Sequence, residues 1–279
     1  MSDMASIRAV IASTERTMKI TSAMQLVASS KMAKSQKAMA SAKPYAETIS
    51  KLMQKVAESY EGLHPFFEKR KGKKIVYIVI SSDRGLCGGL NVALFKTFLK
   101  ALKQSKQENI CLIGNKAKQF FRRVGGNVLA EVTHVGDRPS KHAIDCVIKP
   151  ALDGFLSGEF DEVHLVYNKY VNVMTQEPTI AKLLPIEKST QENTNWDYIY
   201  EPDAESIIDK LVYKYIDSVV YKAVLENIAC EQAARMIAMK SATENAQTVI
   251  DDLNLAYNKA RQAVITTELS EIIAGADAV

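Results

Sequence analysis

The hydrophobic positions near the N-terminus follow a repeat of alternating three- and four-residue steps that runs from Met4 to Val56. Twelve of its sixteen positions are apolar, and the spacing never slips. Such a repeat predicts one long helix that pairs with a second helix in a coiled coil. Pro44 removes one amide donor and should bend this helix. The repeat comprises Met4, Ile7, Ile11, Thr14, Met18, Thr21, Gln25, Ala28, Met32, Ser35, Met39, Ala42, Ala46, Ile49, Met53 and Val56.

A second repeat of the same kind predicts a long C-terminal helix. Both repeats favour Ala, Met and Thr over Leu and Ile, so pairing of the two helices buries little apolar area. Because apolar burial stabilises by roughly 25 cal/mol per Å², the isolated pair should be only marginally stable. We therefore expect the two helices to pair with each other and another partner to enclose them. An ordinary helical bundle is the alternative, although it would show a wider, Leu-rich stripe. The second repeat comprises Leu225, Ala229, Gln232, Met236, Met239, Thr243, Ala246, Ile250, Leu253, Tyr257, Ala260 and Val264.

The predicted lengths of the two helices differ. At 1.5 Å per residue, a helix over 3–58 spans about 84 Å and one over 204–274 about 107 Å. The first helix leads into the middle of the chain and the second leads out of it, so the pair must be antiparallel. We expect the C-terminal helix to project about 22 Å beyond its partner. We also expect both helices to exchange amide hydrogens faster than the middle segment.

The positions of glycine residues in the middle of the chain are typical of the turns in a small α/β domain. No glycine precedes Gly62, and none lies between Gly158 and Gly275. Short apolar runs alternate with helical patterns between these glycines, which indicates a largely parallel sheet. The expected strands are 74–80, 109–114, 127–132 and 162–168, with a weaker candidate at 179–187, and the expected helices are 92–103, 116–124 and 142–156. The predicted domains are 1–60, 70–202 and 203–279.

Composition excludes several classes of protein. The net charge of +4 does not require nucleic acid or a membrane as partner. The apolar run at 75–80 is far shorter than the roughly 20 residues that span a bilayer, so membrane association should be indirect. The first residues resemble neither a secretory signal nor a transit peptide. The four cysteines, Cys87, Cys111, Cys146 and Cys230, show no metal spacing and indicate reduced thiols.

The sequence SSDRGLCGGLN at 81–91 is the strongest candidate for chemistry, because it joins a strand to a helix and is rich in glycine. It contains neither GxGxxG nor Gly-Lys-Ser/Thr, so we interpret it as a tight turn that exposes Arg84 and Cys87. Ser81 and Ser82 lack the Gly-x-Ser-x-Gly elbow of a hydrolase. The four histidines are dispersed. We therefore predict no catalytic, cofactor or metal site.

The first helix carries charge of one sign. No acidic residue lies between Glu15 and Glu47. A solvated helix face usually mixes signs, so this stretch indicates an acidic partner, although a merely soluble surface is the alternative. Nucleic acid is disfavoured because no aromatic residue interleaves with the basic ones. The basic residues are Arg16, Lys19, Lys31, Lys34, Lys37 and Lys43.

Four segments resemble the family of gamma subunits of F-type ATP synthases, in particular those of bacteria. The last is the most specific, since Ile265-Thr266, Glu268, Glu271 and Gly275-Ala276 reproduce the C-terminal signature of that family. The order and spacing of the segments are also similar to the family pattern. One departure is Ala33, where a basic residue is common. The segments are ITSAMQLVASSKM (20–32), SSDRGLCGGLN (81–91), ENIACEQAARMIAMKSATENA (226–246) and KARQAVITTELSEIIAGADA (259–278).

The resemblance implies a fold and a function. The fold would be an antiparallel coiled coil of the two terminal helices with a Rossmann-like α/β domain inserted between them. The chain would be a non-catalytic rotor shaft that couples ion flow through the membrane c-ring to the catalytic beta subunits. Its partners would be the alpha and beta subunits, the epsilon subunit and the c-ring, on the cytoplasmic face of the bacterial inner membrane. A coiled-coil scaffold or signalling protein, and an α/β enzyme with helical extensions, are the alternatives.

The resemblance also implies contact residues. Tyr198 and Glu201, in the segment WDYIYEPD (196–203), would meet the membrane ring. The basic stretch would lie near acidic loops of the beta subunits, and the epsilon subunit would dock beside the α/β domain. Ten residues would contact the alpha and beta subunits: Met24, Lys31, Lys34, Arg84, Cys87, Arg235, Arg261, Gln262, Thr266 and Glu268.

Overall fold

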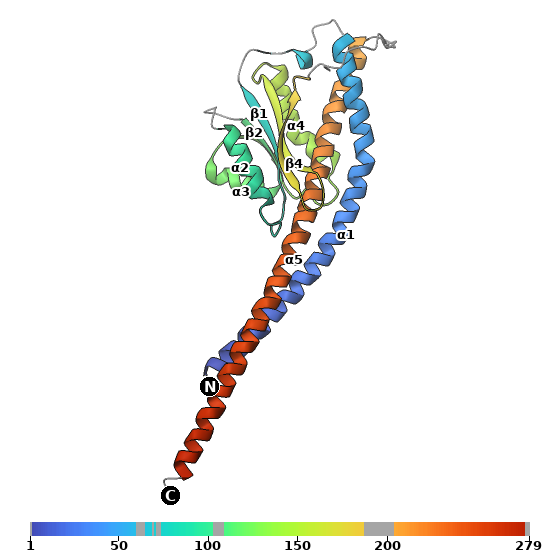
Figure 1. Ribbon diagram of the computed structural model, residues 1–279. Coiled ribbons are helices and arrows are strands. Elements are labelled where there is room, and N and C mark those ends of the chain that lie inside the picture. The colour runs from blue at the N-terminus through green and yellow to red at the C-terminus, as the bar shows by residue number, and fades with distance from the viewer. Residues whose placement is uncertain are drawn as a thin grey trace. The chain divides into compact units, whose positions relative to one another are not determined.

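The computed structural model describes residues 2–59, 65–68, 70, 74–102, 109–186 and 204–276. Two long helices, α1 and α5, begin and end the chain, and the strands and shorter helices lie between them in sequence (Figure 1). The chain divides into a helical unit, Met1–Ser29 with Arg235–Val279, and an α/β unit, Ser30–Ala234. The elements are α1 (Ser2–Ser59), η1 (Pro65–Phe67), β1 (Ile75–Ile80), α2 (Leu90–Leu102), β2 (Asn109–Ile113), α3 (Asn115–Val124), β3 (Asn127–Val132), α4 (Lys141–Leu156), β4 (Glu162–Tyr170), β5 (Gln176–Leu184) and α5 (Ala204–Ala276).

The α/β unit contains a five-stranded sheet with the order β3-β2-β1-β4-β5. β1 pairs in parallel with both β2 and β4, and β2 pairs in parallel with β3, whereas β5 is antiparallel to β4. β1 and β2 are almost continuously buried because helices cover both faces of a parallel sheet. Figure 1 shows α2 and α3 on one face of the sheet and α4 on the other.

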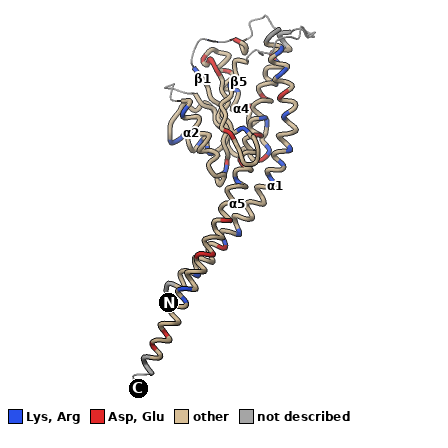
Figure 2. The backbone as a smooth tube through the Cα atoms, in the orientation of Figure 1, with Lys and Arg blue, Asp and Glu red and all other residues tan. Residues whose placement is uncertain are grey.

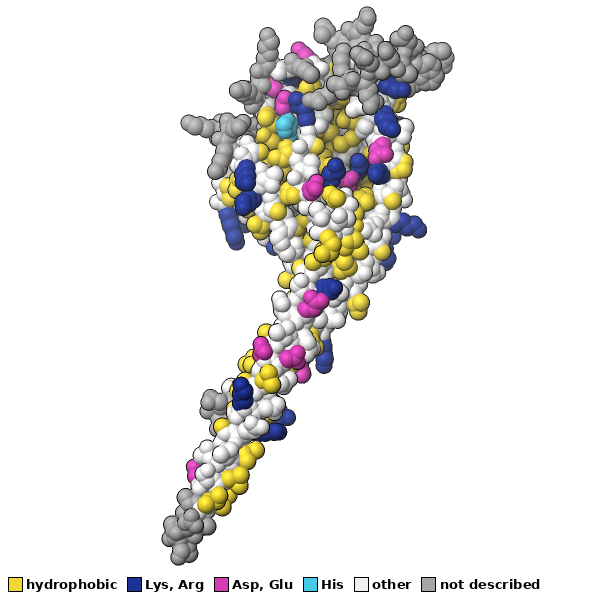
Figure 3. Space-filling view, in the orientation of Figure 1, with side chains coloured by type: hydrophobic (Ala, Val, Ile, Leu, Met, Phe, Trp, Pro, Cys, Tyr) yellow, Lys and Arg dark blue, Asp and Glu magenta, His cyan; other side chains and the backbone are white. Residues whose placement is uncertain are grey.

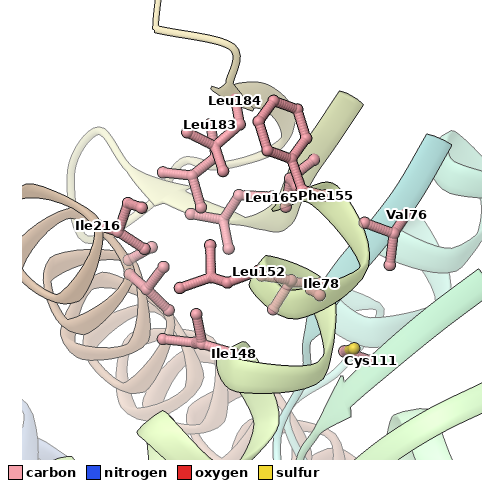
Figure 4. Packing of buried hydrophobic residues seen from close by; sticks show 14 of the residues in the cluster. Val76, Ile78, Cys111, Ile148, Leu152, Phe155, Leu165, Leu183, Leu184 and Ile216 are labelled. Carbon is pink, nitrogen blue, oxygen red and sulfur yellow. The ribbon is translucent and has the colours of Figure 1, made fainter. Parts of the chain in front are cut away.

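The larger core of the α/β unit lies between the sheet, α4 and the first part of α5. In Figure 4, Ile148 and Leu152 of α4 converge with Leu165 of β4 and Ile216 of α5. All of these side chains are buried, Ile216 completely. The first part of α5 is therefore a core helix of the α/β unit and not only a strand of a coiled coil.

Both hydrophobic repeats are confirmed as buried seams. Every position of the first repeat, and every position of the second, is buried or half-buried. Within the helical unit, the hydroxyl groups of Thr21 and Thr243 lie 2.8 Å apart across the seam. Pro44 lies inside α1, which continues to Ser59. The three- and four-residue pattern thus identified the buried and half-buried positions of both helices.

The predicted elements of the middle segment are confirmed, with small shifts at their ends. The weaker strand candidate at 179–187 is β5, which begins three residues earlier and closes an edge of the sheet. The division into 1–60, 70–202 and 203–279 stays a prediction. Within the described ranges, no helix has an apolar stretch that could cross a bilayer.

Candidate functional site

The 81–91 turn leaves the carboxyl end of β1, and its polar side chains bind the protein's own backbone. The carboxylate of Asp83 accepts hydrogen bonds from the amides of Asn115 at 3.0 Å, His134 at 2.9 Å and Gly136 at 3.4 Å. Ser81 Oγ accepts a bond of 2.8 Å from the amide of Ala117. Asp83 therefore satisfies the first turn of α3 and holds the loop that follows β3. Because the side chains of Asp83 and Ser81 are hydrogen-bonded to the protein's own backbone, the turn has a structural role.

The turn does not expose both of the residues that the sequence indicated. Arg84 is exposed, but the prediction that Cys87 is exposed was wrong, because Cys87 is 3% exposed. Cys87 packs with Leu90 and with Cys230 of α5 in a small apolar cluster. The side chain amide of Asn91 donates to Cys87 Sγ at 3.3 Å and fixes the thiol inward.

The loop of residues 133–140, between β3 and α4, contacts both long helices. The ammonium of Lys31 on α1 lies 2.7 Å from one carboxylate oxygen of Asp137, and the side chain of Gln232 on α5 donates to the other at 3.4 Å. The sequence predicted an acidic partner for the basic stretch, but it did not identify Asp137 as an acid within the same chain. No sequence signal marks Asp137, since it lies about 100 residues from both contacts.

A groove of about 660 Å³ lies beside this contact. Lys31, Lys34, Lys37 and Arg138 line it, and among the described residues Asp137 is the one acid in its lining. Figure 2 shows further basic residues along α1. Lys34 and Lys37 are exposed, and Lys43 pairs with Glu47 at 3.7 Å. The groove keeps an excess of positive charge after its internal ion pair is counted, and such a surface attracts acidic groups.

The last part of α5 is bare within this chain. Every described side chain from Ile265 to Ile273 is exposed, whereas Val264 is the last residue of the seam. Among these side chains, Ile265, Leu269, Ile272 and Ile273 are 47–68% exposed. Figure 3 shows hydrophobic side chains near the C-terminal end of the helical unit. Exposed apolar side chains in such a group mark a surface that another molecule covers.

The structure places the remaining predicted contact residues as follows. Arg261, Gln262, Thr266 and Glu268 are exposed on the last part of α5, beside the bare apolar side chains. Met24 is half-buried in α1, and Arg235 of α5 is only 8% exposed. Tyr198 and Glu201 lie outside the described residues. Whether any of these residues contacts a partner stays a prediction.

The described residues offer little for covalent chemistry. Among them, no group of three or more His, Cys, Asp or Glu side chains could hold a metal ion. Burial raises the pKa of the Cys111 thiol to about 12 and also raises the pKa of the Cys230 thiol, which keeps both protonated and unreactive. The surfaces described above are suited to binding proteins.

Comparison with known proteins decides the family. The family model described as ATP synthase matches residues 3–279. The ATP synthase gamma chain of Nitrosococcus oceani is 49% identical over 282 residues, which cover 98% of each chain. The chain belongs to the ATP synthase gamma chain family.

Solved structures show that the fold is shared with distant ATP synthase chains. A chain of the Euglena gracilis mitochondrial ATP synthase (OSCP/F1/c-ring, rotational state 3) matches with a TM-score of 0.72 at 20% identity, over 99% of this chain and 94% of that one. A chain from the rotor of the same enzyme, in rotational state 1, matches with a TM-score of 0.68 at 18% identity, over 95% and 99%. The two chains therefore share the fold of this protein, two long terminal helices with a sheet inserted between them in sequence, at low sequence identity.

Proposed function

We propose that this gamma chain is the central rotor shaft of an F-type ATP synthase, which couples ion flow through a membrane ring to ATP synthesis or hydrolysis. The observation that carries the proposal is 49% identity to a curated gamma chain over 98% of both chains. The exposed apolar end of α5 agrees with it, because a shaft that turns inside other subunits needs a helix that its own chain leaves uncovered.

Coupling follows from the asymmetry of this surface. An antiparallel pair that becomes a single helix beyond Val264 presents different side chains in each direction. Each orientation of the shaft then favours one conformation of each surrounding catalytic subunit, and the difference in contact energy is the coupling free energy between shaft and catalytic sites. The chain forms and breaks no covalent bond in this scheme, so it is a non-catalytic subunit.

The partners are the alpha and beta subunits around the shaft, the epsilon subunit beside the α/β unit, and the membrane ring. Arg261, Gln262, Thr266 and Glu268 surround the bare apolar side chains and would supply polar contacts there. The basic groove on α1 would face acidic loops of the beta subunits. Met24, Arg84 and Arg235 complete the proposed hexamer contacts, and Cys87, which was also expected there but is buried, would contribute only by holding the fold of its turn. Tyr198 and Glu201 would meet the ring.

A bacterial source and the cytoplasmic face of the inner membrane are the proposed setting. The identity of 49% to the Nitrosococcus oceani chain, against 18–20% to the mitochondrial chains, supports this choice. Membrane association would be peripheral, through the ring.

Purification of the tagged chain from membranes of its source organism tests the function. Alpha, beta and epsilon subunits should co-purify in fixed ratio, and the complex should hydrolyse ATP while the isolated chain neither binds nor hydrolyses it. Recovery of the chain alone from gently solubilised membranes, or a micromolar dissociation constant for Mg-ATP in the isolated chain, would contradict the proposal and favour the scaffold or enzyme alternatives.

A further inference from the structure

The part of α5 that packs in the larger core carries a ladder of apolar side chains at every fourth residue. Each side chain of this ladder is β-branched, and each is 0–6% exposed in the larger core. Consecutive members lie about 6 Å apart along the axis, slightly more than one turn, so the ladder winds gradually around the helix. The ladder comprises Ile208, Val212, Ile216, Val220, Val224 and Ile228.

A regular ladder of this kind cannot by itself fix the position of the helix. If α5 slid by four residues, each Val or Ile would occupy the site of the next, with a rotation of about 40°. The ladder side chains themselves would stay buried after this slip, whereas the neighbouring row of Leu211, Tyr215, Val219 and Ala223, which packs on the same core, would exchange side chains of different size. The position of α5 along its axis is therefore set by contacts outside the ladder.

One of these contacts is a buried polar pair. The side chain amide of Asn168, in β4, donates to Asn227 Oδ1 on α5 at 2.9 Å. Asn168 is 0% exposed and Asn227 is 1% exposed. After a slip by four residues, Asn168 would face Ala223 or Glu231, and Asn227 would be carried about 6 Å along the axis, so the buried hydrogen bond between the two amides would be lost. Leaving buried polar groups unpaired is costly, so the pair disfavours the slipped register.

Two further observations locate this contact at one level of α5. Cys230, three residues after Asn227, donates its thiol hydrogen to the backbone oxygen of Asn168 at 3.3 Å. The side chain oxygen of Asn168, Oδ1, has no hydrogen-bond partner among the described residues. A polar pair that leaves one acceptor unsatisfied adds little net stability, which is typical of buried groups retained for specificity.

We propose that Asn168 and Asn227 are positioning residues that fix the axial and rotational register of α5 on the sheet of the α/β unit. The ladder supplies burial in several registers, and the amide pair, with the neighbouring row, favours one of them. Resting on the proposed function, the consequence is mechanical: torque applied to the α/β unit passes to α5 without slippage.

The register can be measured on the isolated full-length chain by electron–electron spin resonance. Spin labels would be attached at Arg122→Cys on α3 and Lys214→Cys on α5, both exposed, in a Cys146→Ser background that removes the exposed native thiol. The parent should give one narrow distance distribution. Asn168→Leu with Asn227→Leu replaces both amides by apolar groups of similar size and should add a second population, displaced by up to about 6 Å.

The matched control is Asn109→Leu with Asn127→Leu, which removes an exposed hydrogen-bonded pair of the same type on β2 and β3. It should leave the distribution narrow. If the buried double Leu variant fails to fold, Asn168→Ala with Asn227→Ala, which introduces no added bulk, is measured in its place. A distribution as narrow as the parent's in a folded buried-pair variant overturns the proposal.

The mechanical consequence is tested in the assembled complex in lipid vesicles. The buried-pair variant should hydrolyse ATP at a rate within two-fold of the parent while ion uptake per ATP falls at least two-fold. If a variant with a broadened distance distribution still takes up the normal number of ions per ATP, the proposed role of the pair in transmitting torque is overturned. If the proposed rotor function is wrong, the parent complex itself will not take up ions during ATP hydrolysis. The spin-label measurement needs only this chain, so it would still report the register of α5.

Discussion

The carboxylate of Asp137 lies 2.7 Å from the ammonium of Lys31 on α1, and its other oxygen accepts a hydrogen bond from Gln232 on α5. A single loop residue thus contacts the parts of both long helices, α1 and α5, that belong to the α/β unit. At the same end of the sheet, Gln36 of α1 donates to the hydroxyl of Tyr170 at 2.6 Å. The carboxyl end of the sheet therefore holds the two helices as a pair, and it does so with polar contacts that substitution can test.

Reversing the charge at Lys31 should cost more than reversing it at Lys34. Lys31→Glu places two carboxylates together and should lower the free energy of unfolding by about 1 kcal/mol, the upper range for a partly exposed pair. Lys34→Glu, on the same groove but without an internal partner shown, should change it by less than about 0.5 kcal/mol. Combining Lys31→Glu with Asp137→Lys should restore most of the loss in urea unfolding. Equal effects of both single changes would show that the ion pair contributes nothing.

The exposed lysines of the groove should matter for coupling. Lys34→Glu with Lys37→Glu removes positive charge that Asp137 does not neutralise, and it puts like charges opposite an acidic partner. The assembled complex should retain part of its ATP hydrolysis while ion transport per ATP falls, most clearly at low salt. Lys51→Glu with Lys55→Glu, on exposed positions of the same helix outside the groove, is the control. Normal transport in a fully assembled Lys34/Lys37 variant would mean that the groove is a solvated surface.

Glu226 should make stability depend on pH. Burial raises the pKa of its carboxyl, and the charges of Lys222, Lys169 and Lys43 only partly oppose this. Between the ordinary pKa of 4.5 and the raised value, the folded state binds more protons than the unfolded state, so stability falls as the pH rises through that window. Glu226→Gln should therefore be more stable than the parent at pH 8, by about 1 kcal/mol, because one buried charged oxygen lacks a partner.

A matched pair on the same helix provides the control for Glu226. Glu244 lies 3.8 Å from Lys240 at the same four-residue spacing and distance as Glu226 from Lys222, but it is 65% exposed against 11%. Glu244→Gln should change the melting temperature by no more than one or two degrees at any pH. If the two substitutions shift the melting temperature equally between pH 5 and pH 8, burial of Glu226 is not the cause.

One native thiol should react and three should not. Cys146 is exposed, whereas Cys87, Cys111 and Cys230 are buried. A maleimide added to the native chain should modify Cys146 within minutes, and peptide mass spectrometry should find the other three unmodified until denaturant is added. Rapid modification of Cys87 would show that the 81–91 turn opens in solution.

The rate of amide hydrogen exchange should differ between parts of α5. The sequence alone predicts fast exchange throughout the long helices, but the structure buries the apolar ladder of α5 in the core of the α/β unit. Residues 208–230 should exchange as slowly as β1 and β4, and residues 265–273 should exchange fastest among the described residues because no side chain of this chain covers them. Uniform protection along α5 would contradict this division.

The sequence by itself determined the two seams, the alternation of strands and helices, and the family. The seams were predictable because a helix that buries one stripe must repeat its apolar residues every three or four positions, and every predicted position is buried or half-buried. The bare end of α5 was predictable for the same reason, since the second repeat ends at Val264 and the helix continues.

Contacts between distant segments were decided only by the tertiary structure. Cys87 looked exposed because its neighbours are turn residues, yet the fold brings Cys230 against it across more than a hundred residues. Asp137 and the Asn168–Asn227 pair carry no local signature for the same reason: a single polar residue has no period, and its partner is set by where the sheet carries it. Periodic patterns reveal which face of an element is buried, whereas the register between elements depends on individual long-range contacts that only the folded chain brings together.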